Sequence, residues 1–165
     1  MAIRFSKMHG AGNDFVLIDV RGGQRQPDAS IARAIGDRHT GVGFDQLLTI
    51  EASNSPGCVA RYRIWNSDGS QAQQCGNGAR CVAAWLVRDG AASPPGFKLE
   101  SPAGVIDVEC LADGRFALDM GLPEFTPSAI PFNVAAERVQ YEVVLDGKPT
   151  RFGAVSMGNP HAVIV

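Results

Sequence analysis

The strongest constraint on the fold of this chain is one helical segment that is apolar on nearly every side. The pattern predicts a helix from about Asn77 to Asp89. Gly90 follows it and suits the left-handed residue that ends many helices. Its interior residues are almost all apolar: Ala79, Cys81, Val82, Ala83, Ala84, Trp85, Leu86 and Val87. A helix of this kind is expected to be buried on all sides, so we expect a curved, barrel-like antiparallel sheet around it.

Strand-like segments make up most of the remaining chain. They are Ile3–Met8, Phe15–Val20, Gln46–Glu51, Cys58–Trp65, Phe97–Glu100, Val105–Cys110, Arg115–Met120, Val139–Leu145, Phe152–Ser156 and Ala162–Val165. Gly-containing loops or turns are expected at His9–Asp14, Asn66–Gly69, Ala112–Gly114, Asp146–Gly147 and Met157–His161. A second helix is predicted over Ser30–Arg38, with Ser30 as N-cap. Together these elements predict an α+β fold.

A change in composition divides the chain. The stretch Gly121–Phe132 contains three prolines and is typical of a crossover. We therefore expect residues 1–120 to form one lobe and residues 121–165 to form the crossover and the start of a second. The apolar run Ala162–Val165 at the end of the sequence would expose a hydrophobic strand. This favours a second lobe that is incomplete within these 165 residues.

Cys75 has the most reactive setting of any residue in the sequence. It directly precedes the predicted apolar helix, and Gly76 and Gly78 follow it. A helix N-terminus favours the thiolate form of a cysteine, and its free N–H groups bind anions. Small residues let a ligand approach the backbone closely. The segment therefore predicts a reactive sulfur beside an anion-binding cradle.

The other three cysteines have ordinary settings. Cys58 and Cys110 lie in strand-like runs and Cys81 lies inside the apolar helix, so we expect small buried hydrophobic residues there. The chain has no Cys-x-x-Cys pair, which argues against a zinc knuckle or a thioredoxin-type centre. We expect four free thiols in a reducing compartment.

The composition excludes several classes of partner. A net charge of −2 gives no electrostatic basis for binding nucleic acid or an anionic membrane. No apolar run reaches transmembrane length, and the N-terminus lacks the apolar core of a signal peptide. We expect a cytoplasmic protein.

Polar residues beside glycines recur where strands are predicted to end. The candidates for substrate contacts are Asn13, Gln46, Asn66 and Asn159, in four separate loops. Amide side chains both donate and accept, which suits a ligand that carries ammonium and carboxylate groups. Each residue alone is also an ordinary turn residue. Ligand sites, however, are commonly built from several loops.

Two kinds of thiol chemistry are compatible with this pattern. His9, His39 or His161 would be needed as a partner base in a thiol hydrolase, but no hydrolase signature surrounds Cys75. His161 is better placed to support Asn159 nearby. Alternatively, the thiolate removes a proton α to a carboxylate held by backbone N–H groups. That reaction needs a second acid on the opposite face of the carbon.

Five motifs together resemble those of diaminopimelate epimerases. They are Lys7–Val16, Gly41–Leu48, Tyr62–Ser70, Gln74–Cys81 and Gly153–His161. The resemblance implies two pseudo-symmetric lobes, each with an antiparallel barrel-like sheet around a central helix. It implies cofactor-independent interconversion of LL- and meso-2,6-diaminopimelate, toward lysine and peptidoglycan. It also implies a homodimer.

The resemblance assigns roles residue by residue. Cys75 corresponds to one of two facing catalytic cysteines, one a thiolate base and the other a thiol acid. Gly76 and Asn77 correspond to the backbone donors that hold the reacting carboxylate. Asn13, Gln46, Asn66 and Asn159 correspond to substrate-contacting positions. The second cysteine of the family lies further downstream than Val165, so we expect these 165 residues alone to be inactive.

Two alternatives remain open from the sequence. One is a relative with another substrate, such as a proline racemase or a phenazine-pathway isomerase. The other is a non-catalytic lobe that binds substrate with the cradle around Cys75 but lacks the second thiol.

Overall fold

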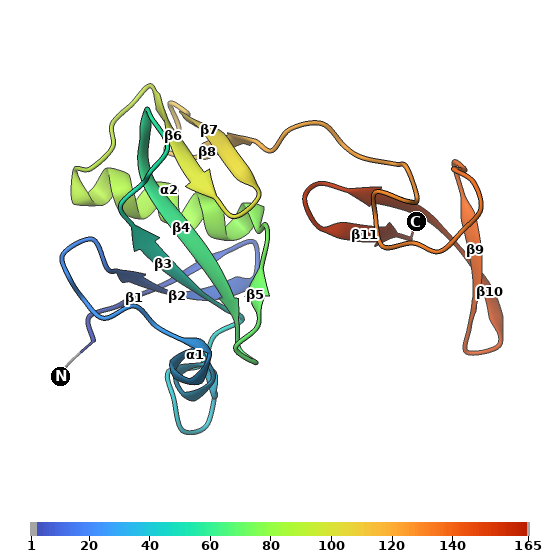
Figure 1. The fold of residues 1–165 in the computed structure, drawn as a ribbon, viewed down its shortest axis with the longest axis horizontal. Helices are drawn as coiled ribbons and strands as arrows, with labels where there is room; N and C mark the ends of the chain where they lie inside the picture. The colour runs from blue at the N-terminus through green and yellow to red at the C-terminus, as the bar shows by residue number, and fades with distance from the viewer. Residues whose placement is uncertain (1–2, 165) are drawn as a thin grey trace. The chain divides into compact units, whose positions relative to one another are not determined.

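The computed structural model describes residues 3–164, which divide into two compact units, Met1–Asp119 and Met120–Val165 (Figure 1). The first unit contains eight strands and two helices. Its strands are β1 (Ser6–Gly10), β2 (Asn13–Asp19), β3 (Gln46–Glu51), β4 (Cys58–Asn66), β5 (Gln71–Ala72), β6 (Gly96–Ser101), β7 (Gly104–Cys110) and β8 (Phe116–Asp119). Its helices are α1 (Ala29–Gly36) and α2 (Gly76–Asp89). This mixture confirms the predicted α+β class.

The strands of the first unit form one mixed sheet. Their order is β1-β2-β3-β4-β6-β7-β8, and β5 pairs with β4. Most neighbours are antiparallel, but β2 pairs with β3, and β4 with β6, in parallel. The prediction of an antiparallel sheet was therefore wrong at two places. In both, a helix lies in the connection, and such a crossover returns the chain in its original direction.

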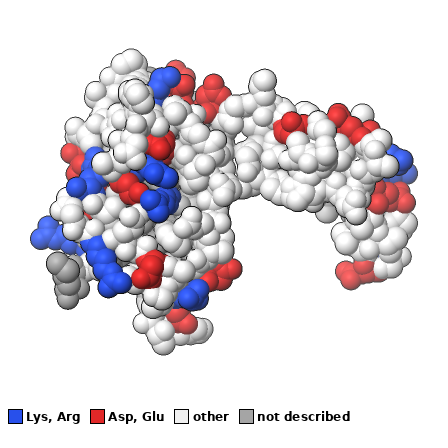
Figure 2. Space-filling view, viewed as in Figure 1, with Lys and Arg blue, Asp and Glu red and all other residues white. Residues whose placement is uncertain are grey.

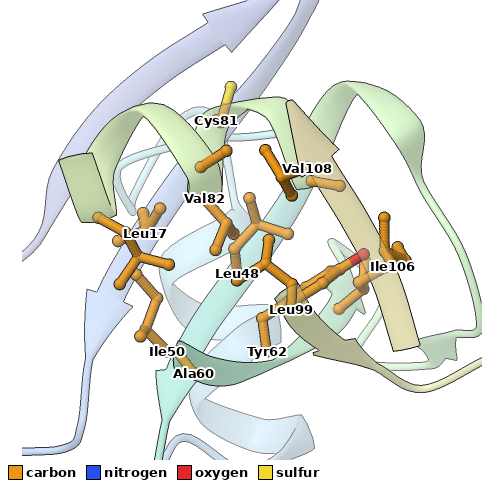
Figure 3. Close-up of a cluster of buried hydrophobic side chains, with 14 of the residues drawn as sticks. Leu17, Leu48, Ile50, Ala60, Tyr62, Cys81, Val82, Leu99, Ile106 and Val108 are labelled. Carbon is orange, nitrogen blue, oxygen red and sulfur yellow. The ribbon is translucent and has the colours of Figure 1, made fainter. Parts of the chain in front are cut away.

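Helix α2 packs against the concave face of this sheet. Figure 3 shows Val82 of α2 close to side chains from β2, β3 and β6. The helix is not buried on all sides, because Arg80, Ala84 and Trp85 are half-buried and Arg88 is exposed. Its C-terminus is as predicted: Gly90 has a φ of 77°, and its N–H donates to Leu86 and Val87 carbonyls.

Helix α1 packs on the opposite side of the strands. Val16, Ile18 and Leu47 form a second buried cluster with Ala32 of α1, whereas Phe15 and Leu17 belong to the α2 cluster. Successive residues of β2 thus face two different helices. This explains why β2 has a continuous apolar run instead of polar alternation.

Two boundaries differ from the sequence-based expectation. The N-cap of α1 is Asp28 and not Ser30, because the Asp28 carboxylate accepts the N–H groups of Ser30 and Ile31 at 3.0 Å each. The predicted loop His9–Asp14 is a two-residue hairpin turn, with Ala11 at φ 51° and Gly12 at φ 93°. Asn13 consequently begins β2 instead of lying in the predicted loop.

The second unit contains a three-stranded sheet. Its strands are β9 (Tyr141–Leu145), β10 (Lys148–Ser156) and β11 (Pro160–Val163), in the order β11-β10-β9. The Asp146-Gly147 turn joins β9 to β10 as predicted, and β10 begins directly after it instead of at Phe152. The last strand begins at Pro160, two residues before the predicted start. Val165, where it was predicted to end, lies outside the described residues.

Aromatic rings form the centre of the second unit. The ring of Phe132 meets that of Tyr141 edge to face, with centroids 4.6 Å apart, and Phe152 packs beside both. In the part of the chain that the structure describes, neither helix has the length and apolarity needed to cross a bilayer.

Candidate active site

The directions of three strands bring three predicted site residues to one edge of the sheet. Because β2 and β3 are parallel, Asn13 and Gln46 both begin their strands at that edge. Because β4 is antiparallel to β3, Asn66 ends its strand there, directly opposite Gln46. The mixed topology therefore places amide side chains from distant segments side by side.

Cys75 is the N-cap residue of α2. Its backbone is extended, with φ −152° and ψ 102°, and its half-buried side chain turns back over the first turn of the helix. The sulfur accepts the backbone N–H of Gly78 at 3.3 Å. Negative charge on a sulfur placed there is stabilised by that N–H and by the helix dipole.

Two further donors lie at the same helix end. The backbone N–H groups of Gly76 and Asn77 belong to the first turn of α2, which begins at Gly76. The first N–H groups of any helix lack intrahelical partners and form an anion site when they are accessible. Both residues are half-buried and not enclosed in the core, and this helix end is suited to a carboxylate beside the Cys75 sulfur.

A hydrogen bond links this helix end to the β1–β2 hairpin. The Nδ2 of Asn77 donates to the Oδ1 of Asn13 at 2.7 Å. The Nδ2 of Asn13 donates in turn to the Oδ2 of Asp45 at 3.2 Å. Asn13, 64 residues from Asn77 in the sequence, is thus fixed beside the catalytic candidate.

Gln46 and Asn66 form a second pair. The Nε2 of Gln46 donates to the Oδ1 of Asn66 at 3.1 Å, and the Nδ2 of Asn66 donates to the Oγ of Ser70 at 3.0 Å. Gln46 follows Asp45 directly in the chain, so this pair lies near the hydrogen-bonded group that contains Asn13. Asn13, Gly76 and Asn77 thus lie at the helix end that carries Cys75, and Gln46 and Asn66 lie at the same end of the strands as Asn13.

Asn159 belongs to the second unit, whose placement relative to the first is not determined. It lies in the turn between β10 and β11, where its carbonyl accepts the N–H of Met157 at 3.2 Å. The Nδ1 of His161 is 2.7 Å from the same oxygen, which confirms the local role expected of His161.

A cluster of charged residues lies next to Asn13 at this edge of the sheet. The Asp14 carboxylate is 2.7 Å from both the Arg38 guanidinium and the Lys7 ammonium. Hydrogen bonds from Arg38, and then from Lys7, hold the pKa of Asp14 well below its usual range. Figure 2 shows basic and acidic side chains interspersed on the viewed face of this unit.

The other cysteines differ clearly from Cys75. Cys81 is only 4% exposed, and burial raises the pKa of its thiol. Cys58 and Cys110 are half-buried, so the expectation of fully buried side chains holds for Cys81 alone. All four thiols are free, as predicted. Among residues 3–164, no three His, Cys, Asp or Glu side chains form a group suited to a metal ion.

Comparison with known proteins identifies the family. The family model for diaminopimelate epimerase matches residues 5–126. This chain belongs to the diaminopimelate epimerase family. Curated diaminopimelate epimerases from Xanthomonas oryzae and Xylella fastidiosa strain M12 are 59% and 52% identical to it, each over 98% of this chain.

The chain spans 57% of the length of these diaminopimelate epimerases. Solved structures with low sequence identity share its fold. A probable proline racemase from Agrobacterium radiobacter superposes with a TM-score of 0.74 at 15% identity, over 99% of this chain and 52% of that one. A hydroxyproline epimerase from Agrobacterium vitis gives 0.69 at 16% identity, over 98% and 51%.

No role was predicted from the sequence for two residues of this hydrogen-bonded group in the diaminopimelate epimerase family member. Asp45 accepts the Asn13 amide, and Arg80 donates to the Oδ1 of Asn77. The three-residue spacing of Asn77 and Arg80 on one helix was a usable signal. The contact of Asp45 with Asn13 had no local signal, because it depends on the parallel pairing of β2 and β3.

Proposed function

We propose that this chain is the N-terminal part of a cofactor-independent epimerase that interconverts LL- and meso-2,6-diaminopimelate. One observation carries the proposal: the Cys75 sulfur lies at the N-terminus of α2, beside the backbone N–H groups of Gly76 and Asn77 in the first turn of the helix. A thiolate and a carboxylate cradle at adjoining positions are what α-proton removal from an amino acid requires.

The proposed reaction moves one proton off the α-carbon and another onto it. The Cys75 thiolate takes the α-proton and becomes a thiol, and the electron pair of the C–H bond is delocalised into the α-carboxylate. The N–H groups of Gly76 and Asn77 stabilise the added negative charge. A thiol on the opposite face then donates its proton to the carbon, which inverts the centre. In the reverse direction, the two sulfurs exchange roles.

The opposite thiol is proposed from the family resemblance and lies beyond this chain. Cys81 is unsuited to the role because it is buried in the apolar core on the side of α2. Cys58 and Cys110 lie on strands β4 and β7 and are not at the helix end. We therefore propose that the 165 residues alone bind diaminopimelate without epimerising it.

The substrate contacts follow from the amide residues at the sheet edge. Asn13, Gln46 and Asn66 offer both donors and acceptors there, and Asn159 is proposed to join them from the second unit. Diaminopimelate has an ammonium and a carboxylate group at each end, so a site that holds both ends needs such mixed partners. We propose that the full-length protein acts as a cytoplasmic homodimer on this free amino acid, supplying lysine and peptidoglycan synthesis.

A substrate panel with the full-length protein tests this function. LL-diaminopimelate, meso-diaminopimelate, L-proline and trans-4-hydroxy-L-proline are each incubated with enzyme, and the stereoisomers are separated by chiral chromatography. Conversion of the two diaminopimelate isomers alone is expected. Turnover of proline without diaminopimelate would assign the chain to a relative with another substrate.

Calorimetry on the 165-residue chain tests whether this part binds the substrate without the second thiol. Heat of binding with meso-diaminopimelate, without α-deuterium uptake in D₂O, is the expected result. Epimerisation by this chain alone would show that a single thiol suffices. No binding would show that Asn13, Gln46, Asn66 and the cradle do not form a substrate site by themselves.

A further inference from the structure

A continuous chain of hydrogen bonds crosses the candidate site from α2 to the loop before β3. The Arg80 guanidinium donates to the Oδ1 of Asn77, and the Nδ2 of Asn77 donates to the Oδ1 of Asn13 at 2.7 Å. The Nδ2 of Asn13 donates to the Oδ2 of Asp45 at 3.2 Å, and Arg38 binds the other oxygen of Asp45 at 2.8 Å. Four side chains from three segments are therefore linked, and every hydrogen bond between them has its donor on the Arg80 side and its acceptor on the Asp45 side.

The two end groups of this hydrogen-bond chain differ chemically from the two amides in its middle. A carboxamide has a donor end and an acceptor end, and a half-turn about its last bond exchanges them with little change in shape. A guanidinium can only donate and a carboxylate can only accept. Arg80 at one end and Asp45 at the other therefore allow only one direction for the two amides between them.

We propose that Asp45 and Arg80 are positioning residues that fix the orientation in which Asn13 presents its amide group to the substrate, Arg80 acting through the side-chain amide of Asn77. This inference rests on the proposed function, in which Asn13 contacts diaminopimelate. With Asp45 and Asn77 bound, Asn13 retains one N–H and one lone pair for a ligand. A reversed Asn13 would place its NH₂ against that of Asn77, and two donors would face each other.

The surroundings support a positioning role for both residues. Arg80 is half-buried in α2, three residues after Asn77, so it reaches Asn77 along the same helix face. Asp45 also accepts the backbone N–H of Asp14 at 3.1 Å and is held by Arg38. Asp45 is therefore anchored independently of the two amides, and Arg80 belongs to the same helix as the amide that it binds.

Two substitutions remove the directing ends, and the first of them also keeps the shape of the side chain. Asp45→Asn and Arg80→Gln each replace a group of fixed polarity by a carboxamide that works in either direction. In the full-length enzyme, each is expected to lower kcat/KM for meso-diaminopimelate about tenfold, because the reacting groups lose their fixed orientation. Arg80→Lys keeps a group that only donates and is expected to restore most of the activity.

Matched controls separate positioning from simple loss of charge. Arg88→Gln makes the same change two turns further along α2, where the side chain is exposed and donates to the Oγ of Ser6. Asp107→Asn makes the same change as Asp45→Asn on β7, where the carboxylate is exposed and lies 3.4 Å from the Lys98 ammonium. Both controls are expected to keep kcat/KM within about twofold of wild type, in line with distant or screened sites.

A double-substitution cycle tests whether the ends act through Asn13. In an Asn13→Ala background, Asp45→Asn and Arg80→Gln are each expected to change kcat/KM by less than about twofold, because the amide that they orient is gone. Full additivity of the losses would overturn the proposal, since it would mean that Asp45 and Arg80 act independently of Asn13.

A readout without turnover keeps the proposal testable if the proposed function fails. In full-length protein labelled with ¹⁵N-asparagine, the side-chain NH₂ signals of Asn13 and Asn77 are assigned with the Asn→Ala variants. Asp45→Asn and Arg80→Gln are expected to shift both pairs of signals, whereas the control Asp107→Asn leaves them in place. Unmoved signals would overturn the orientation claim. A wild-type enzyme that leaves diaminopimelate unchanged would refute the proposed function, and the signals would still decide the orientation.

Discussion

The sulfur of Cys75 accepts the backbone N–H of Gly78 at 3.3 Å, so the first turn of α2 folds back onto its own N-cap side chain. Gly78 also lies close to β3: a Cβ there would be 3.1 Å from the Cδ2 of Leu48, whereas it would be in ordinary contact with the sulfur at 3.5 Å. The glycine therefore leaves space for the Leu48 side chain against the first turn of α2.

Replacing the buried cysteine of α2 separates packing from chemistry. Cys81→Ala is expected to lower the free energy of unfolding of the full-length protein by no more than about 2 kcal/mol, because it removes one buried sulfur. The epimerisation rate is expected to stay within a few-fold of wild type, since Cys81 faces the core and not the helix end. Urea denaturation and an activity assay measure the two effects. A folded variant without activity would show that Cys81 takes part in catalysis.

The ion pairs of Asp14 predict a specific dependence of stability on pH. Arg38 and Lys7 hold the pKa of Asp14 below its ordinary value of 3.8. A lowered pKa contributes stability that is present above the ordinary value and is lost as the pH falls through the folded-state value. Asp14→Asn is therefore expected to be less stable than wild type at pH 7, and the difference is expected to shrink below about pH 4.

Urea midpoints of wild type and Asp14→Asn at pH 7 and pH 3 measure this difference. Asp107→Asn is the control, because its exposed carboxylate is 3.4 Å from the Lys98 ammonium and such pairs contribute little. The same difference for Asp14→Asn at both pH values would contradict the assignment of its ion pairs.

The loop after α1 passes very close to the end of that helix. A Cβ on Gly41 would lie 2.4 Å from the carbonyl oxygen of Ala34 and 2.5 Å from that of Ile35. Gly41→Ala is expected to destabilise the protein by about 1–3 kcal/mol, because backbone atoms have to move. Gly22→Ala is the matched control, since a Cβ there would have no neighbour within 4 Å. Equal thermal midpoints for the two variants would contradict this packing.

Local sequence patterns predicted the elements but not all of their partners. The apolar period of α2, with Gly90 behind it, was sufficient to place that helix to within one residue. The start of β2 was misplaced because a glycine-rich segment suggested a long loop, whereas Ala11 adopts a left-handed conformation that shortens it to a hairpin turn. Asp28 was missed because Ser30 is an equally good N-cap by residue type.

In the candidate site, too, local features were predictable from the sequence and long-range contacts were not. Cys75, Gly76 and Asn77 were predictable together, since their chemistry depends on a single helix end. The contact between Asn13 and Asn77 spans 64 residues and depends on how β2 is placed against α2. Asp45 was beyond sequence reasoning for the same reason, because an acidic residue before a strand has no local feature that indicates its partner.

The most direct test of the account is α-deuterium incorporation into meso-diaminopimelate in D₂O by the full-length protein and its Cys75→Ser variant. The account predicts rapid incorporation by wild type and a loss of at least about 100-fold in the variant, because a serine hydroxyl is a far poorer base. Circular dichroism confirms that the variant is folded. Incorporation by Cys75→Ser at close to the wild-type rate would contradict the assignment of Cys75 as the proton-transferring group.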